Sequence, residues 1–108
     1  MNQETNWGYE AILLDRKEYP TKIMVLKEGE SLPYIYHKKR DKSWILLQGV
    51  LQINIEGGIK LLNEGETQHI SPGLMHTATA IKGDATIIEV GTQLLDDAVI
   101  VGDKYQNR

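Results

Sequence analysis

The chain has 108 residues, 41% of them hydrophobic and 25% charged, which is the composition of an ordinary folded domain rather than of a disordered or fibrous chain. Its 12 basic and 15 acidic side chains leave a formal charge of -3, so the sequence shows no electrostatic footprint of nucleic-acid binding. The absence of cysteine excludes disulfides, thiolate-held zinc, iron–sulfur clusters and cysteine nucleophiles.

The first residues, MNQETNWGYE, are polar and lack the basic and then apolar layout of a signal peptide. No apolar run approaches the length that spans a bilayer. We therefore expect a cytoplasmic protein with no membrane partner, folded as one domain over residues 1–108.

Glycine, proline and aspartate divide the sequence into short extended segments, none of which has a sustained helical periodicity. The regular spacing of these segments predicts an all-β barrel or sandwich. The predicted strands are Tyr9 to Leu14, Thr21 to Leu26, Tyr34 to His37, Trp44 to Leu47, Val50 to Ile55, Ile59 to Leu62, Thr67 to Ile70, His76 to Ala80 and Thr86 to Val90. The apolar residues Ala98 to Val101 predict that the tail from Asp96 to Arg108 lies against the barrel.

A tight hairpin is predicted at Glu56-Gly57-Gly58, because a short glycine-containing loop there separates two alternating strands. Leu51, Ile53 and Ile55 alternate with polar residues, which places one face of that strand in a core and the other in water.

Two spaced patterns carry a family resemblance. Five residues fall on the fixed positions of G-x5-H-x-H-x4-E-x6-G: Gly29, Ile35, His37, Lys42 and Gly49. Five more fall on those of G-x5-P-x-G-x2-H-x3-N, with Pro72 displaced by one from the proline position: Gly65, Ser71, Gly73, His76 and Ala80. The sequence thus resembles the cupin superfamily, which implies a single-domain all-β barrel, a double-stranded β-helix or jelly roll.

Within the cupins, the chain is similar over nearly its whole length to type II mannose-6-phosphate isomerase domains. The segments that carry this similarity are Trp7-Gly8-Tyr9, Gly29-Glu30-Ser31-Leu32, Arg40, Trp44, Gly65-Glu66, Ile88-Glu89-Val90 and Asp103-Lys104-Tyr105 close to Arg108. The resemblance implies a sugar-phosphate isomerase or epimerase that uses a divalent metal to polarise the carbonyl of an open-chain sugar.

The resemblance also implies which residues form the site. It places His37, His76 and Lys42 in catalytic positions and makes His37 and His76 the remaining metal ligands. Ile35 stands where the family has glutamine or histidine, and Lys42 stands where it has a liganding glutamate. Because an ammonium repels a dication, the expected cofactor is either none or a weakly held Zn, Mn, Fe or Ni ion.

Several of these residues have two readings. Lys42 either points inward, where its cation attracts a phosphate, carboxylate or hydroxyl-rich ligand, or lies in a turn and reaches water. His37 and His76 either take part in binding or proton transfer, or are buried histidines left from a lost metal site. Arg40 either forms a basic rim that meets a sugar phosphate or belongs to a solvated charged loop.

Small and aromatic side chains complete the expected pocket. Ala78 and Ala80 share the parity of His76 and would leave space for a ligand, although small residues also occur at barrel tapers for packing alone. Trp7, Tyr9 and Trp44 would stack on a sugar ring or fill the core. His69 is a spare ligand or, more simply, a surface residue.

Three classes of function remain open at this point. The chain is a sugar-phosphate enzyme, a metal-free module that binds a small polar molecule, or a structural or regulatory barrel. In each case we expect a homodimer, because exposed strand edges need cover.

Overall fold

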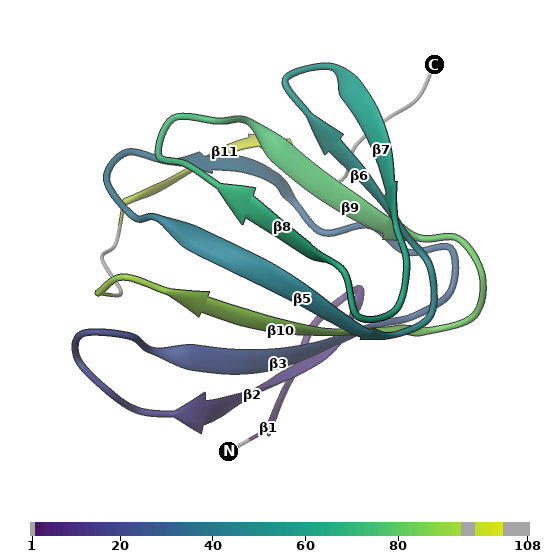
Figure 1. Ribbon diagram of the computed structural model, residues 1–108, viewed down its shortest axis with the longest axis horizontal. Helices are drawn as coiled ribbons and strands as arrows, with labels where there is room; N and C mark the ends of the chain where they lie inside the picture. Colours follow the sequence, from purple (N-terminus) through teal and green to yellow (C-terminus); the bar gives the residue numbers. More distant parts are fainter. Residues whose placement is uncertain (1, 94–96, 103–108) are drawn as a thin grey trace.

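The computed structural model describes residues 2–93 and 97–102, and every regular element in them is a β-strand (Figure 1). The all-β prediction is confirmed. The strands are β1 (Asn2–Glu4), β2 (Gly8–Leu14), β3 (Thr21–Leu26), β4 (Tyr34–His37), β5 (Lys42–Gln48), β6 (Leu51–Ile55), β7 (Gly58–Leu62), β8 (Thr67–Ile70), β9 (His76–Ala80), β10 (Ala85–Gly91) and β11 (Ala98–Gly102). The described residues contain no helix that could cross a membrane.

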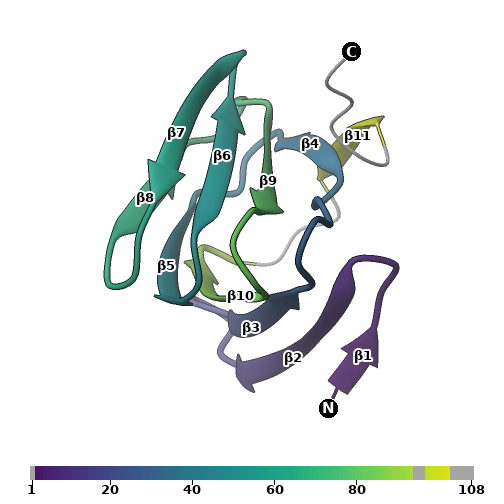
Figure 2. The same cartoon turned by 90° about the vertical axis from the view of Figure 1, so that its right-hand side faces the viewer.

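The strands form two antiparallel sheets that enclose a common interior. A six-stranded sheet has the order β1-β2-β3-β10-β5-β8, and a five-stranded sheet has the order β11-β4-β9-β6-β7. The six-stranded sheet fills the lower part of Figure 1, and Figure 2 shows the second sheet facing it. Because β10 lies between β3 and β5, residues from the two ends of the chain meet at the centre of the six-stranded sheet.

The predicted strands all occur, with differences at their ends. β5 begins at Lys42 and not at Trp44, and β10 runs from Ala85 to Gly91. The short β1 was not predicted, because its residues are polar and its pairing with β2 supplies only backbone hydrogen bonds. The part of the tail that is described pairs with β4 as β11, as expected. Asp96 and residues 103–108 lie outside the described residues.

The predicted hairpin joins β6 to β7. Ile55 pairs with Gly58, so the connection has only Glu56 and Gly57 in its loop. Both have positive φ, 51° and 84°, which is the geometry of a type I′ turn and matches the twist of the flanking strands.

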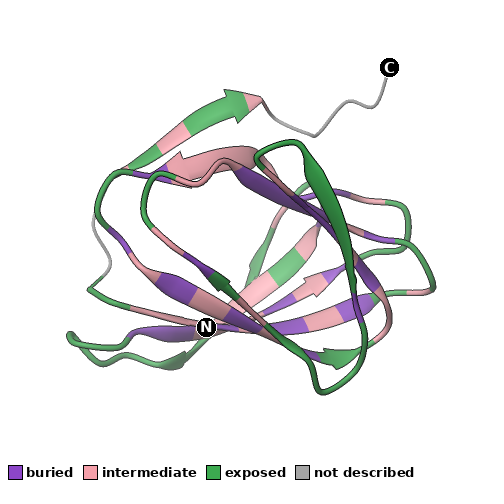
Figure 3. Cartoon of the chain, turned by 45° about the horizontal axis from the view of Figure 1, so that its top comes forward, coloured by how far each residue is buried: buried purple, intermediate pink, exposed green. Residues whose placement is uncertain are grey.

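Alternation along the strands separates the interior from the surface. On β5 the buried side chains are Lys42, Trp44 and Leu46, and on β10 they include Ile87 and Glu89. β7 is exposed along most of its length and appears green in Figure 3. Two charged residues thus share the inward face with the hydrophobic core, and such residues are seldom buried unless they are paired.

Candidate functional site

A cavity of about 310 Å³ lies inside the barrel, with walls from both sheets. Its apolar wall includes Trp7, Met24, Leu32, Ile35 and Trp44. Its ionisable side chains are Glu10, Lys22, His37, Arg40, Lys42, His76 and Glu89. The sequence-predicted residues His37, His76, Lys42, Ile35 and Arg40 therefore come together around one space.

Glu89 is the charged centre of the wall formed by the six-stranded sheet. It lies between Lys22 on β3 and Trp44 on β5 in the strand register, so the three side chains share a face. Trp44 Nε1 donates to Glu89 Oε1 at 2.8 Å, and Arg40 Nη1 donates to Oε2 at 2.9 Å. Burial alone would raise the pKa of Glu89, but Lys42, Lys22 and Arg40 outweigh it and hold this pKa far below its ordinary range.

Lys42 points inward and is buried, so the reading that places it in a turn is wrong. Its Nζ lies 3.0 Å from His37 Nε2 and 3.3 Å from Glu89 Oε1, and it sits 5.4 Å from the centre of the Trp44 ring. Burial lowers the pKa of Lys42, and the carboxylate of Glu89 opposes this effect. The ammonium is thus fixed by an imidazole, a carboxylate and an aromatic face.

Asp97 fixes the ring of His37 from the side away from Lys42. Asp97 Oδ1 lies 3.1 Å from His37 Nδ1, while Oδ2 accepts from the backbone N–H groups of Lys39 and Arg40 at 2.8 and 2.9 Å. Burial raises the pKa of Asp97, but these hydrogen bonds prevail and lower it to about 2. A proton on Nδ1 leaves the Nε2 lone pair of His37 free to accept from the Lys42 ammonium.

His37 and His76 line the cavity from the neighbouring strands β4 and β9 of the five-stranded sheet, with ring centres 6.0 Å apart. Burial, and then the positive charge of Lys42, lower the pKa of both, that of His76 to about 4. His76 Nδ1 donates to the carbonyl of Leu74 at 2.8 Å. Its buried Nε2 has no hydrogen-bond partner within the described part of the chain. At neutral pH, His76 therefore presents a lone pair that needs a donor.

Arg40 is only 3% exposed, so the reading as a solvated loop residue is corrected. Its Nε donates to the carbonyl of Thr92 at 3.3 Å, and its guanidinium pairs with Glu89. The side chain passes over Gly91, where an added Cβ would lie 2.6 Å from Nη2. Arg40 therefore balances charge inside the wall and does not project as a free basic rim.

Ala78 and Ala80 do not line the cavity, and their expected place on its wall is corrected. Both are fully buried in the hydrophobic cluster, where they pair with Ile53 and Leu51 of β6 across the five-stranded sheet. Their small side chains serve packing, which was the simpler of the two readings. Ile35, which pairs with His76, does line the cavity.

The structure distinguishes between the alternatives given for the aromatic residues and for His69. Trp7 and Trp44 are both buried in the core and also line the cavity, whereas Tyr9 is 39% exposed and lies outside it. His69 is on the surface, where its Nε2 lies 2.6 Å from Asp41 Oδ1. It cannot serve as a ligand in this cavity.

The residues present do not fit the divalent metal that the family resemblance implies. The described residues contain no group of three or more histidine or carboxylate side chains arranged to hold an ion. The Nε2 atom of His37, one of the two expected ligand atoms, is occupied by the Lys42 ammonium at 3.0 Å. A dication needs three or more protein ligands and is repelled by this charge.

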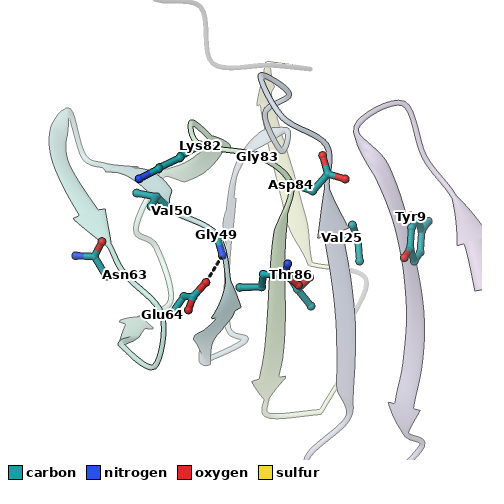
Figure 4. A pocket seen from close by; sticks show the side chains of 11 residues that line it. Tyr9, Val25, Gly49, Val50, Asn63, Glu64, Lys82, Gly83, Asp84 and Thr86 are labelled. Carbon is teal, nitrogen blue, oxygen red and sulfur yellow. Dashed lines mark hydrogen bonds between the residues drawn. The ribbon is translucent and has the colours of Figure 1, made fainter.

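A wider and open hollow lies on the outer face of the six-stranded sheet (Figure 4). Figure 4 shows Tyr9 at one end and Asn63 at the other, with Lys82, Val50 and Val25 between them. The turn beside it is held by the Gly49 N–H, which donates to Glu64 Oε2 at 3.0 Å. The hollow contains none of the buried paired charges, so we place the candidate site in the interior cavity.

Sequence reasoning missed four members of this site: Glu89, Lys22, Glu10 and Asp97. Glu89 carried a usable signal, because it has the inward parity of the apolar strand Thr86 to Val90, and a carboxylate there requires a buried partner. Lys22 has the parity of the buried Met24 and Leu26 on β3, and its register with Glu89 brings it to the site. Asp97 is 60 positions from His37, and only the return of β11 beside β4 brings the two together.

Comparison with known proteins agrees with this architecture. Among solved structures, KdgF from Halomonas sp. superposes with a TM-score of 0.80 at 19% identity, covering 89% of this chain and 88% of that one. A sugar phosphate isomerase from a cupin superfamily, from Silicibacter pomeroyi, superposes with a TM-score of 0.73 at 19% identity, covering 80% and 59%. At these identities the likeness shows the fold, which is that of a cupin.

Sequence comparison gives the family. The chain is 30% identical over 103 residues to mannose-1-phosphate guanylyltransferase of Escherichia coli K12, a match that covers 92% of this chain. It spans only about a fifth, 22%, of the length of that relative. The family model described as mannose-6-phosphate isomerase C-terminal matches residues 2–103. The chain therefore belongs to the mannose-6-phosphate isomerase C-terminal family.

Proposed function

We propose that this cupin binds a small hydroxylated ligand of the sugar-phosphate class in its interior cavity without a divalent metal. The observation that carries the proposal is the lone pair of His76 Nε2, which is buried on the cavity wall with no donor among the described residues. Leaving a buried acceptor without a partner costs about 1–3 kcal/mol, so a ligand hydroxyl that donates to it has an energetic reason to enter.

Lys42 supplies the complementary donor. An ammonium has three N–H groups, and the described residues offer two acceptors to Lys42, His37 Nε2 and Glu89 Oε1. The remaining N–H is available to a ligand oxygen. A cavity of about 310 Å³ is at the small end of ligand sites, which suits a monosaccharide rather than a nucleotide.

The relatives support the choice of ligand class. The names of two similar proteins, a mannose-1-phosphate guanylyltransferase and a sugar phosphate isomerase, both contain a sugar phosphate. Lys22 and Glu10 are partly exposed, line the cavity and form an ion pair of 2.9 Å, and the Lys22 ammonium is the group to which a phosphate would bind. The sugar ring would lie deeper, against Trp7 and Trp44.

The test is a calorimetric titration of chelator-treated protein with mannose 6-phosphate, mannose 1-phosphate and mannose. We expect one of the three to bind, and we expect His76→Leu to weaken it by about tenfold or more, because one hydrogen bond is lost and the cavity wall becomes apolar. The matched control is His69→Leu, which removes an exposed histidine on another face. Equal affinity in His76→Leu and His69→Leu would place the ligand elsewhere.

A second candidate is metal-free isomerisation of the same ligand. It is favoured by two neutral imidazoles, His37 and His76, on neighbouring strands that line the cavity, and by the Lys42 ammonium in the same cavity. Both ring nitrogens of His37 are engaged, so His76 Nε2 would move the proton between the two carbons, and the ammonium would stabilise the oxyanion that forms. Conversion of mannose 6-phosphate to the ketose in the presence of chelator would support catalysis, and deuterium uptake from solvent would locate the transferred proton. Binding without ketose formation or deuterium uptake would mean that the protein binds the ligand and does not isomerise it.

A further inference from the structure

We infer that the ammonium of Lys42 takes the place of a divalent metal ion in this cavity. The positive charge of the site is then supplied by a residue of the chain itself. The inference deepens the proposed function, and the part that concerns the ligand rests on it. The part that concerns the cation does not, because it can be tested with metal ions alone.

The first argument is that Lys42 uses the atom a metal would require. Its Nζ lies 3.0 Å from His37 Nε2, and Asp97 behind His37 directs that lone pair toward Lys42. A carboxylate on the far nitrogen of a histidine is the device that orients metal-binding imidazoles. Here the same device orients the imidazole toward an ammonium.

The second argument is that Lys42 cannot move aside. The residue is 5% exposed, and it begins β5, paired on both sides with Ile70 of β8 and Gly91 of β10. Glu89 Oε1 holds its Nζ at 3.3 Å. Moving the ammonium out would remove one of the charges that balance this buried carboxylate, so the cation stays where a metal would have to sit.

The third argument concerns what such a cation can bind. An ammonium is a compact point charge that attracts phosphate, carboxylate or polarised carbonyl oxygens, and it needs no open coordination position. With the Nε2 lone pair of His76 on the facing wall, the cavity offers one charged donor and one neutral acceptor. This combination suits a ligand with an anionic or carbonyl oxygen next to a hydroxyl group.

The test replaces the Lys42 ammonium with a side chain that can coordinate a metal ion. Zn²⁺ and Ni²⁺ are titrated by calorimetry into chelator-treated protein, with Lys42→His and Lys42→Met compared with the unaltered residue. All three proteins carry His69→Ala, because the exposed His69–Asp41 pair could bind metal on the surface. We expect Lys42→His to bind at least about 100-fold more tightly than the protein with Lys42, since three imidazoles complete a site. Lys42→Met, which removes the charge and adds no ligand, should gain less than about tenfold.

Two results would overturn the inference: tight metal binding by the protein that retains Lys42, or no gain in a Lys42→His variant whose circular dichroism shows the folded barrel. If Lys42→His does not fold, the protein that retains Lys42 and carries His69→Ala still decides, because a Zn²⁺-dependent rise in its melting temperature would contradict an occupied cation site. Failure of every sugar phosphate to bind would contradict the proposed function. It would not affect the inference about the cation, which the metal titrations test separately.

Discussion

Removing the charge of Glu89 should be among the most damaging conservative changes in this protein. Glu89→Gln keeps the size of the side chain and leaves Trp44 an oxygen to donate to, but it leaves Arg40 and Lys42 without their carboxylate at 2.9 and 3.3 Å. Breaking a buried ion pair by neutralising one partner costs about 3–5 kcal/mol. Domains are stable by about 5–15 kcal/mol, so much of the stability would be lost.

The measurement is urea unfolding followed by circular dichroism, since Trp44 contacts Glu89 and its fluorescence would change for local reasons. With a slope of about 1.5 kcal/mol per molar urea, the midpoint should fall by about 2–3 M. Glu10→Gln is the control, because its pair with Lys22 is partly exposed and should be worth about 0–1 kcal/mol. Adding Lys42→Met to Glu89→Gln should recover stability by removing an uncompensated cation. A loss below about 1 kcal/mol for Glu89→Gln, similar to that of the control, would refute the reasoning.

Two further predictions concern the protonation of His76 and the substitution of Gly49. His76 has a pKa of about 4 when folded against an ordinary value of 6.5, so the unfolded chain takes up its proton first and stability should fall as the pH drops from 6.5 to 4, by on the order of 3 kcal/mol. His37, which faces His76 together with Lys42, acts in the same direction, so His76→Leu should flatten the profile in part, and parallel profiles would contradict the assignment. Gly49 has a φ of 95°, and an added Cβ would lie 2.5 Å from the carbonyl oxygen of Asp84, so Gly49→Ala should lower stability by about 2–4 kcal/mol in thermal unfolding. Gly73→Ala, at a φ of 86° with open space around it, should cost only about 1 kcal/mol, and equal losses would show that crowding is unimportant.

Local chemistry made most of the fold predictable. The hairpin was predictable because a short glycine-containing loop separates two alternating strands, and Gly57 adopts the positive φ that its turn requires. The strands followed from alternation, and the family resemblance anticipated that His37 and His76 would line one cavity. β1 escaped prediction because Asn2–Glu4 carries no apolar alternation, and its strand state depends on the neighbour it pairs with.

The sequence by itself determined the strand pattern and the tight turn, because each depends on residues close together in the chain. Only the tertiary structure decided the direction of Lys42, the burial of Arg40 and the part played by Asp97. Those outcomes depend on two strand pairings. β10 lies beside β5, which brings Glu89 to Lys42, and β11 lies beside β4, which brings Asp97 to His37. A charged side chain can be buried only where its counter-charge arrives, and that meeting is set by strand order and register rather than by spacing along the chain.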